Sequence, residues 1–326
     1  MVLEKESSVL GYPGEVSKAL SADHHGICKY EGPQDPNYIT VRNVLKSLVG
    51  KILAKDNAKQ PELTERRAAL DLKSLFALSE LPGLDYIFFR DQWTEDTNNW
   101  INNDKTLLHW RDSQDGQTVL WLNGSAATGK SILASTIINN LVQDGYPCQY
   151  FFIRHGDRKK RSLGFLIRSL AFQIAQSVPG LAHQLNELKD EGTDFETADP
   201  KVIWDRVFKS IIFKSVWEQP LYWIIDGLDE IESPRNTIKL LLDITTCSPI
   251  RILFSSRRNP VIINAFDRRP TNICFLTLDI DGHLKDIGIH VRQELRVPGG
   301  NELRERIEQQ IIQKSQNNFL VRIPSP

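Results

Sequence analysis

The sequence predicts an α/β fold in which a parallel sheet is flanked by helices, preceded by a helical amino-terminal connector. Beyond about residue 116, apolar runs of strand length alternate with stretches of helical period. Strands that are apolar throughout indicate a sheet covered on both faces, and helices between them indicate parallel pairing. The expected strands span residues 118–123, 148–153, 221–226, 251–256 and 274–278. The expected helices span residues 130–143, 163–178, 200–215, 235–245, 284–296 and 301–315.

The amino-terminal part of the chain has a different pattern. Residues 1–42 are rich in Gly, Pro, Asp, His and Tyr and show no sustained period. Residues 41–54 and 62–78 place apolar side chains three and four positions apart, which predicts two amphipathic helices separated by a turn near Pro61. We therefore expect three parts: an irregular segment (1–42), a helical connector (43–84) and the α/β domain (85–323).

Composition limits the class of protein. The 326 residues include 40 basic and 41 acidic side chains, so the near-neutral balance gives no reason to expect a nucleic acid or an anionic membrane as partner. The amino terminus lacks a signal-peptide pattern, and the chain has no apolar run of membrane-spanning length. The four cysteines are scattered without a CxxC pair, which argues against a zinc site or a disulfide framework. A cytoplasmic protein is expected. The cysteines are Cys28, Cys148, Cys247 and Cys274.

A glycine-rich loop follows the first expected strand and precedes the first expected helix. Its spacing is G-x-x-x-x-G-K-S, the pattern whose backbone N–H groups surround the phosphates of a nucleotide. In such a loop the lysine reaches the β- and γ-phosphates, and the serine hydroxyl binds Mg²⁺. The alternative is a chance glycine-rich turn, which the strand and helix context disfavours. The predicted phosphate-binding residues are Gly124, Ser125, Ala126, Ala127, Thr128, Gly129, Lys130 and Ser131.

Carboxylates follow the expected strand 221–226 in the segment "LYWIIDGLDE". Asp226, at the strand end, is the predicted Mg²⁺ partner of Ser131. Asp229 or Glu230 would orient or deprotonate an attacking water, and the sequence does not decide between them. The alternative is an ordinary polar turn after a strand, because Asp and Gly are common there.

Basic residues follow the next expected strand in "RILFSSRRNP". Arg257 and Arg258 emerge at the carboxyl edge of the sheet, where ligands of open α/β folds bind, and Arg257 is the predicted γ-phosphate sensor. A solvated basic turn is the equal alternative. The run at 154–162 is interpreted as an exposed loop, with a partner-binding patch as the minority interpretation. The pair His109 and Trp110 is a minor candidate for contact with a nucleotide base.

With these motifs the chain resembles the NACHT-type domain of the STAND class of signal-transduction P-loop NTPases, and in particular fungal members with a nephrocystin-3-like region. The resemblance covers roughly residues 85–323 and departs from the family at Ala127, where Gly is frequent, at Arg258, where Pro is usual, and at Val321, where Trp is common. It rests on the segments "VLWLNGSAATGKSILASTII", "YFFIRHGDRKKRSLGFLIRSLAFQI", "WIIDGLDEI", "RILFSSRRNPVI" and "NNFLVRI".

The amino-terminal segment at 11–45 resembles the end of the α/β-hydrolase-like domain that precedes the nucleotide domain in some fungal members. His24 or His25 would then lie near the catalytic histidine position of that domain, but no G-x-S-x-G nucleophile elbow occurs in the sequence. Family members usually continue into a helical and winged-helix lid followed by repeats. The expectation is therefore a partial member of the family.

The resemblance implies a switch that binds ATP or GTP with Mg²⁺ and controls association with itself or with other signalling proteins. Slow hydrolysis would reset the switch, and whether it occurs stays open. The rivals are a non-hydrolysing interaction module and a metabolic P-loop kinase. No N-K-x-D or LSGGQ-like motif is present, which weakens the GTPase and transporter alternatives. Base preference, the sensed ligand and the oligomeric state are not predicted.

Overall fold

A computed structural model describes residues 29–46, 49, 70–113, 117–177, 181–190, 194–215, 217, 219–244, 250–281, 284–294, 301–315 and 319. The chain divides into two compact units, residues 1–67 and 68–326. In the first unit residues 36–46 are helical, and the carboxylate of Asp35 accepts a hydrogen bond from Asn37 N at 2.8 Å, as a residue before a helix does. The predicted boundaries at 42/43 and 84/85 stay predictions, and His24 and His25 lie outside the described residues.

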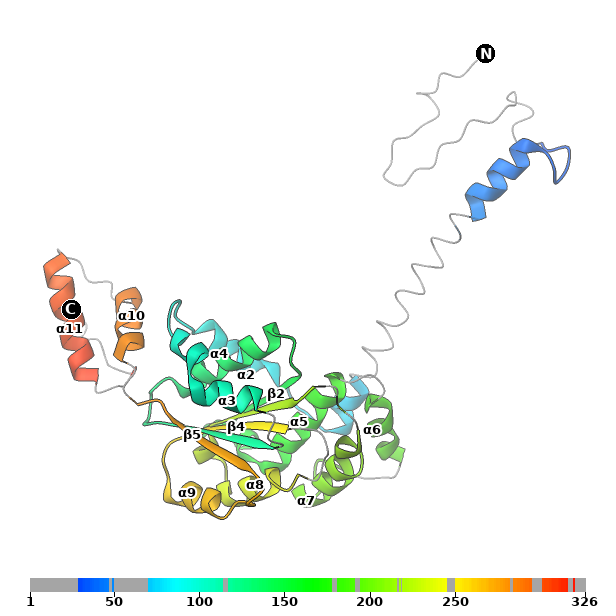
Figure 1. The fold of residues 1–326 in the computed structure, drawn as a ribbon. Helices are drawn as coiled ribbons and strands as arrows, with labels where there is room; N and C mark the ends of the chain where they lie inside the picture. The colour runs from blue at the N-terminus through cyan, green and yellow to red at the C-terminus, as the bar shows by residue number, and fades with distance from the viewer. Residues whose placement is uncertain are drawn as a thin grey trace. The chain divides into compact units, whose positions relative to one another are not determined.

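The second unit contains a sheet of five strands, all of them parallel, in the order β2-β3-β4-β1-β5 (Figure 1). The predicted α/β fold is confirmed, and the strand bounds differ from the predicted ones by at most one residue. The strands are β1 (Thr118–Asn123), β2 (Cys148–Phe152), β3 (Leu221–Asp226), β4 (Ile250–Ser256) and β5 (Cys274–Asp279).

Helices cover both faces of this sheet, as apolar parallel strands require (Figure 1). One hydrophobic cluster joins α3 and α4 to one face, and it includes the fully buried Trp110 and Tyr222. The other cluster joins α5, α7, α8 and α9 to the opposite face, around Trp204 and Trp223. The bounds are α2 (Gly83–Asp91), α3 (Lys105–Asp112), α4 (Lys130–Gln143), α5 (Leu163–Ser177), α6 (Leu181–Asp190), α7 (Pro200–Ile203), α8 (Pro234–Leu241), α9 (Pro260–Asp267), α10 (Leu284–Glu294) and α11 (Asn301–Ser315).

The prediction of one continuous helix over residues 200–215 was wrong. The segment is built from α7, the π-helical turn η4 (Trp204–Lys209) and the 3-10 turn η5 (Ile212–Lys214). Trp204 stacks on Phe208 with ring centroids 4.4 Å apart, and Phe213 meets both rings edge to face. This aromatic packing accompanies the departure from regular α-helix. The remaining short turns are η2 (Asn99–Asn103), η3 (Lys159–Arg161) and η6 (Leu228–Glu230).

Candidate nucleotide site

The glycine-rich loop runs from the end of β1 into α4, as its sequence predicts. Gly129 has φ +83°, a conformation that favours glycine, and Ala127 has φ +57° although it carries a side chain. A Cβ at Gly124 would lie 2.7 Å from a carbon of Ile280, so only glycine fits where the loop passes the end of β5. The loop therefore combines two well-placed glycines with one strained alanine.

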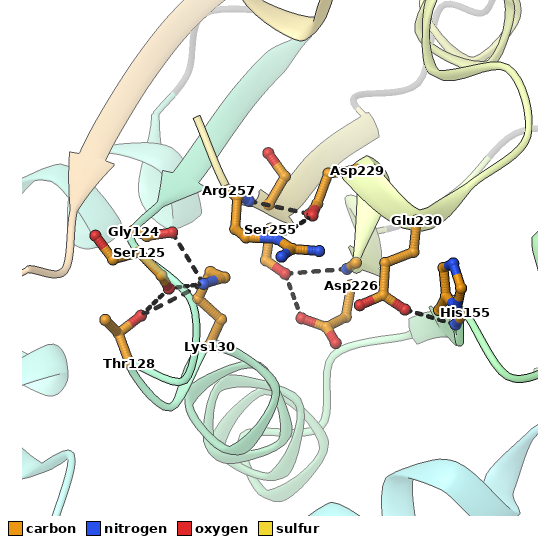
Figure 2. Close-up of polar contacts among 12 residues, drawn as sticks. Gly124, Ser125, Thr128, Lys130, His155, Asp226, Asp229, Glu230, Ser255 and Arg257 are labelled. Atoms are coloured by element: carbon orange, nitrogen blue, oxygen red, sulfur yellow. Dashed lines mark hydrogen bonds and ion pairs between the residues drawn. The ribbon is translucent and has the colours of Figure 1, made fainter. Parts of the chain in front are cut away.

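Lys130, the first residue of α4, folds back over the loop. Its Nζ donates to Gly124 O at 2.9 Å and to Ser125 O, with Thr128 Oγ1 at 3.4 Å (Figure 2). Burial lowers the pKa of Lys130, and the nearby carboxylates, foremost Asp226, oppose that shift. The ammonium thus stands over a loop of small residues, next to the acidic end of β3.

Ser131 and Asp226 are in direct contact. The Ser131 hydroxyl donates to Asp226 Oδ2 at 2.6 Å, and the Ser255 hydroxyl donates to Oδ1 of the same carboxylate. Asp226 is only 3% exposed, and this burial raises its pKa against the effect of the two hydroxyl bonds. The two residues predicted to hold Mg²⁺ therefore lie side by side, although Ser131 is on α4, which follows β1, and β1 is not a neighbour of β3 in the sheet.

The end of β4 connects the two sides of the site through four consecutive residues. Ser255 bonds Asp226 of β3, whereas the Ser256 hydroxyl accepts from Trp121 Nε1 at 2.8 Å and its carbonyl accepts from Gly124 N. The next two residues continue the alternation. Arg257 donates a hydrogen bond to Asp229, which lies after β3. Arg258 donates to Asn123 of β1 at 2.7 Å and to Asp279 of β5 at 2.6 Å.

The predicted water-orienting acids both have partners (Figure 2). Asp229 accepts from Arg257 N at 3.0 Å and from Arg257 Nε at 2.6 Å, and this pair raises the pKa of Arg257. Glu230 accepts from His155 N at 2.6 Å, in the loop that follows β2. The structure thus places Arg257 against a predicted catalytic acid, a pairing that the sequence did not indicate.

Gly227 shapes the turn between Asp226 and these acids. Its φ is +78°, and a Cβ here would lie 2.8 Å from the carbonyl oxygen of Ile153. The amide of Ile153 also donates to Asp226 O at 2.9 Å. The backbone immediately after β2 therefore lies against the turn, and glycine is required there because of both its conformation and its small volume.

Two interpretations of the sequence need correction. The basic run is not wholly exposed, because Lys160 is buried between Asp85 at 2.6 Å and Glu80 at 2.9 Å, where its ammonium joins α2 to η3. Trp110 cannot contact a nucleotide base, because its ring is fully buried and its Nε1 donates to Ile252 O at 3.1 Å.

Three further residues touch the predicted site and were missed. Ser255 contacts Asp226 because β4 lies next to β3 in the sheet, between β3 and β1. Asp281 accepts a hydrogen bond from Ser125 N of the loop. Phe319 donates its N–H to Ala127 O at 2.9 Å, and its ring faces Gly129. The expectation that carboxyl strand ends meet at one edge could have suggested Asp281, whereas no sequence signal points to Phe319.

The donor chemistry of the site fits Mg²⁺. A carboxylate and a hydroxyl are hard oxygen donors, and this ion commonly uses one or two carboxylates together with ligand phosphates and water. Nowhere in the described ranges do three or more His, Cys, Asp or Glu side chains gather into a metal-binding group. The site would therefore depend on oxygens from a bound ligand to complete the coordination sphere.

Two further observations concern the cysteines and the helices. Cys148 and Cys274 are free thiols, and burial raises the pKa of Cys148; Cys28 and Cys247 lie outside the described residues. No helix in the described part of the chain combines the length and apolar character that crossing a bilayer requires.

Comparisons with known proteins show what this chain is similar to. The family model "Nephrocystin 3, N-terminal" matches residues 96–257. The vegetative incompatibility protein HET-E-1 of Podospora anserina is 29% identical over 171 residues, which is 50% of this chain and 12% of that protein. This chain therefore spans a small part of its relative, and the activity of the whole relative does not transfer to it.

Two solved structures show weaker likeness. Drosophila ORC bound to DNA has a TM-score of 0.38 and 11% identity, covering 78% of this chain and 57% of that chain. Drosophila ORC bound to GC-rich DNA and Cdc6 has a TM-score of 0.34 and 11% identity, covering 88% and 39%. At these TM-scores neither structure indicates a ligand of this chain.

The site and the family match support one class of protein. A parallel α/β sheet whose first strand runs into G-x-x-x-x-G-K-S, with an aspartate ending a nearby strand, is the arrangement of P-loop NTPases. Together, the nephrocystin-type match and the fungal relative support a NACHT-like P-loop NTPase. The α/β-hydrolase-like resemblance of the amino-terminal segment stays a prediction.

Proposed function

We propose that this chain is a Mg²⁺-dependent, nucleotide-binding signalling module of the STAND type, in which bound ATP or GTP controls association with other chains. The observation that carries the proposal is the convergence of Lys130, Ser131 and Asp226. Ser131 Oγ lies 2.6 Å from Asp226 Oδ2. The Lys130 ammonium donates to carbonyl oxygens of the loop beside them. Lys130 and Ser131 are the first two residues of α4, and Asp226 is the last residue of β3; a phosphate–magnesium site needs all three.

Binding follows from the chemistry of these side chains. Lys130 exchanges its bonds to Gly124 O and Ser125 O for phosphate oxygens, which is favourable because those carbonyls are weak substitutes for an anion. The Ser131 hydroxyl and the Asp226 carboxylate would hold Mg²⁺ together with oxygens of the ligand and water. The ion would supply charge neutralisation at the phosphates.

Arg257 provides the two states of the proposed switch. Its guanidinium is held by Asp229 at 2.6 Å and is about half exposed. A γ-phosphate competes for this guanidinium and releases Asp229, which is then free to orient a water. Loss of the γ-phosphate restores the ion pair between Arg257 and Asp229. The position of the turn after β3 therefore depends on whether a triphosphate is bound.

A second candidate function is a binding module without turnover. It is favoured by the engagement of both acids, Asp229 by Arg257 and Glu230 by His155 N. In this case triphosphate binds but neither carboxylate reaches a water. The two candidates share the site and differ in phosphate release alone.

The test is Mg²⁺-dependent binding of labelled ATP, ADP and GTP to the full chain, with phosphate release followed in the same samples. Lys130→Ala is compared with Lys239→Ala, a matched control on the exposed surface of α8. Thermal unfolding of each variant establishes that it is folded. We expect binding by the wild type and by Lys239→Ala, and at least a hundredfold loss for Lys130→Ala.

The outcomes separate the candidates. Binding with slow phosphate release supports the hydrolysing switch, and binding without release supports the module without turnover. Folded wild-type protein that binds none of the three nucleotides, or Lys130→Ala that binds as the wild type does, would refute the proposed site.

A further inference from the structure

A second carboxylate meets the phosphate loop from the side of β5. Asp281 Oδ1 accepts from Ser125 N at 2.8 Å, and Oδ2 accepts from the Ser125 hydroxyl at 2.9 Å. Both oxygens are thus committed to one loop residue, immediately after Gly124. The carboxylate is exposed to solvent on its other side.

A relay of contacts fixes the position of Asp281. Its N–H donates to Asp279 Oδ1 at 2.9 Å, and Asp279 Oδ2 is paired with Arg258 at 2.6 Å. Arg258 in turn donates to Asn123 at the end of β1. Asp281 is therefore held by the ends of three adjacent strands, and its contact with the loop does not rest on a single flexible side chain.

The charge of Asp281 has an effect of its own. Its field reaches Lys130, where it is among the carboxylates that favour the charged ammonium. The same field acts against the phosphates of a nucleotide in the loop. For a separation taken as about 10 Å in water, one carboxylate charge against the net double charge of Mg²⁺–triphosphate weakens binding about fourfold before screening by salt.

We propose that Asp281 sets the nucleotide affinity of this site: its two hydrogen bonds position the entrance of the phosphate loop, and its negative charge weakens the binding of the triphosphate. The inference rests on the proposed nucleotide site and deepens it. A site that must exchange its nucleotide benefits from an anion beside the loop, because a lower affinity means faster release. Asp281 acts through Ser125 and through its field, and is a positioning residue.

Two substitutions separate the effect of the hydrogen bonds of Asp281 from the effect of its negative charge. Asp281→Asn keeps an oxygen that accepts from Ser125 N and a group that donates to Ser125 Oγ, but it removes the charge. Asp281→Ala removes both. The matched control is Asp267→Asn, which removes an exposed charge at the end of α9, the helix that leads back to the opposite end of β5.

The experiment measures the Kd of Mg²⁺–ATP and Mg²⁺–ADP for the full chain at about 0.05 M and 0.5 M salt, where screening differs strongly. We expect Asp281→Asn to bind ATP about twofold more tightly than the wild type at low salt, with a smaller gain for ADP and little gain at high salt. Asp281→Ala should bind more weakly than Asp281→Asn, and Asp267→Asn should match the wild type.

The results distinguish two kinds of failure. If the wild type binds ATP and Asp281→Asn binds equally or more weakly at low salt, the role of Asp281 is refuted and the proposed function stands. A gain that is equal at both salt concentrations also refutes the role of its charge. If folded wild-type protein and both Asp281 variants bind no nucleotide, the proposed function fails, and this inference fails with it.

Discussion

Replacement of Gly227 by alanine tests how the structure shapes the acidic turn of the site. An alanine there must adopt φ +78° and must place its Cβ 2.8 Å from the carbonyl oxygen of Ile153. The left-handed conformation costs about 1 kcal/mol, and the close contact adds about 2 kcal/mol because backbone has to move. Ile153 cannot shift freely, since its amide also bonds Asp226 O. We expect a total loss of about 3 kcal/mol.

Gly145 supplies a matched control for this change. It has φ +81° after α4, and a Cβ added there would have no neighbour within 4 Å. Gly145→Ala should therefore cost only the conformational part, about 1 kcal/mol. The difference between the two variants isolates the contact with Ile153.

The assay is urea unfolding of the wild type and both variants, followed by tryptophan fluorescence at one protein concentration. The midpoint of Gly227→Ala should fall well below that of Gly145→Ala, with a similar dependence on urea. Equal losses for the two variants, or a smaller loss for Gly227→Ala, would show that the backbone after β2 does not lie against the turn as the structure indicates.

Two further predictions concern the same site. Ala127→Gly should stabilise the protein by about 0.5 kcal/mol, because the strain removed from the left-handed backbone exceeds the gain in conformational entropy of the unfolded chain. Urea unfolding measures this change, and Ala126→Gly is the control, which should destabilise the protein. Burial raises the pKa of Asp226 above the unfolded value of 3.8, so the folded state holds the proton longer and stability falls as pH rises through that interval. Asp226→Asn should therefore be the more stable protein at pH 7 without nucleotide. Its advantage should vanish below about pH 4, and an advantage independent of pH would contradict the assignment.

Most of the local structure of the sheet and the loop could be predicted from the sequence. The bounds of β1, β3 and α4 were predicted to the residue, because long apolar runs and the glycine-rich loop mark them clearly. The prediction missed α2, whose apolar residues lie on more than one side: Tyr86 and Phe89 pack against the core, whereas Leu84, Ile87 and Phe88 are exposed. It also missed α9, although Asn259 before Pro260 is a recognisable helix start.

The partners within the site depended on strand order, which local pattern does not contain. The loop meets Asp281 because β5 lies next to β1, and Asp229 meets Arg257 because β4 lies next to β3. The predicted residues were therefore brought together at one edge of the sheet. Which residue contacts which could be read only from the folded chain.

The alternation at the end of β4 has a consequence for how this segment can change during evolution. Ser255 and Arg257 bond residues at and just after the end of β3, whereas Ser256 and Arg258 bond residues of β1 and β5. Each position can accept a substitution at the cost of its own contacts. Insertion or deletion of one residue would exchange all four sets of partners at once. Functional relatives should therefore vary in residue type over these four positions and keep their number constant.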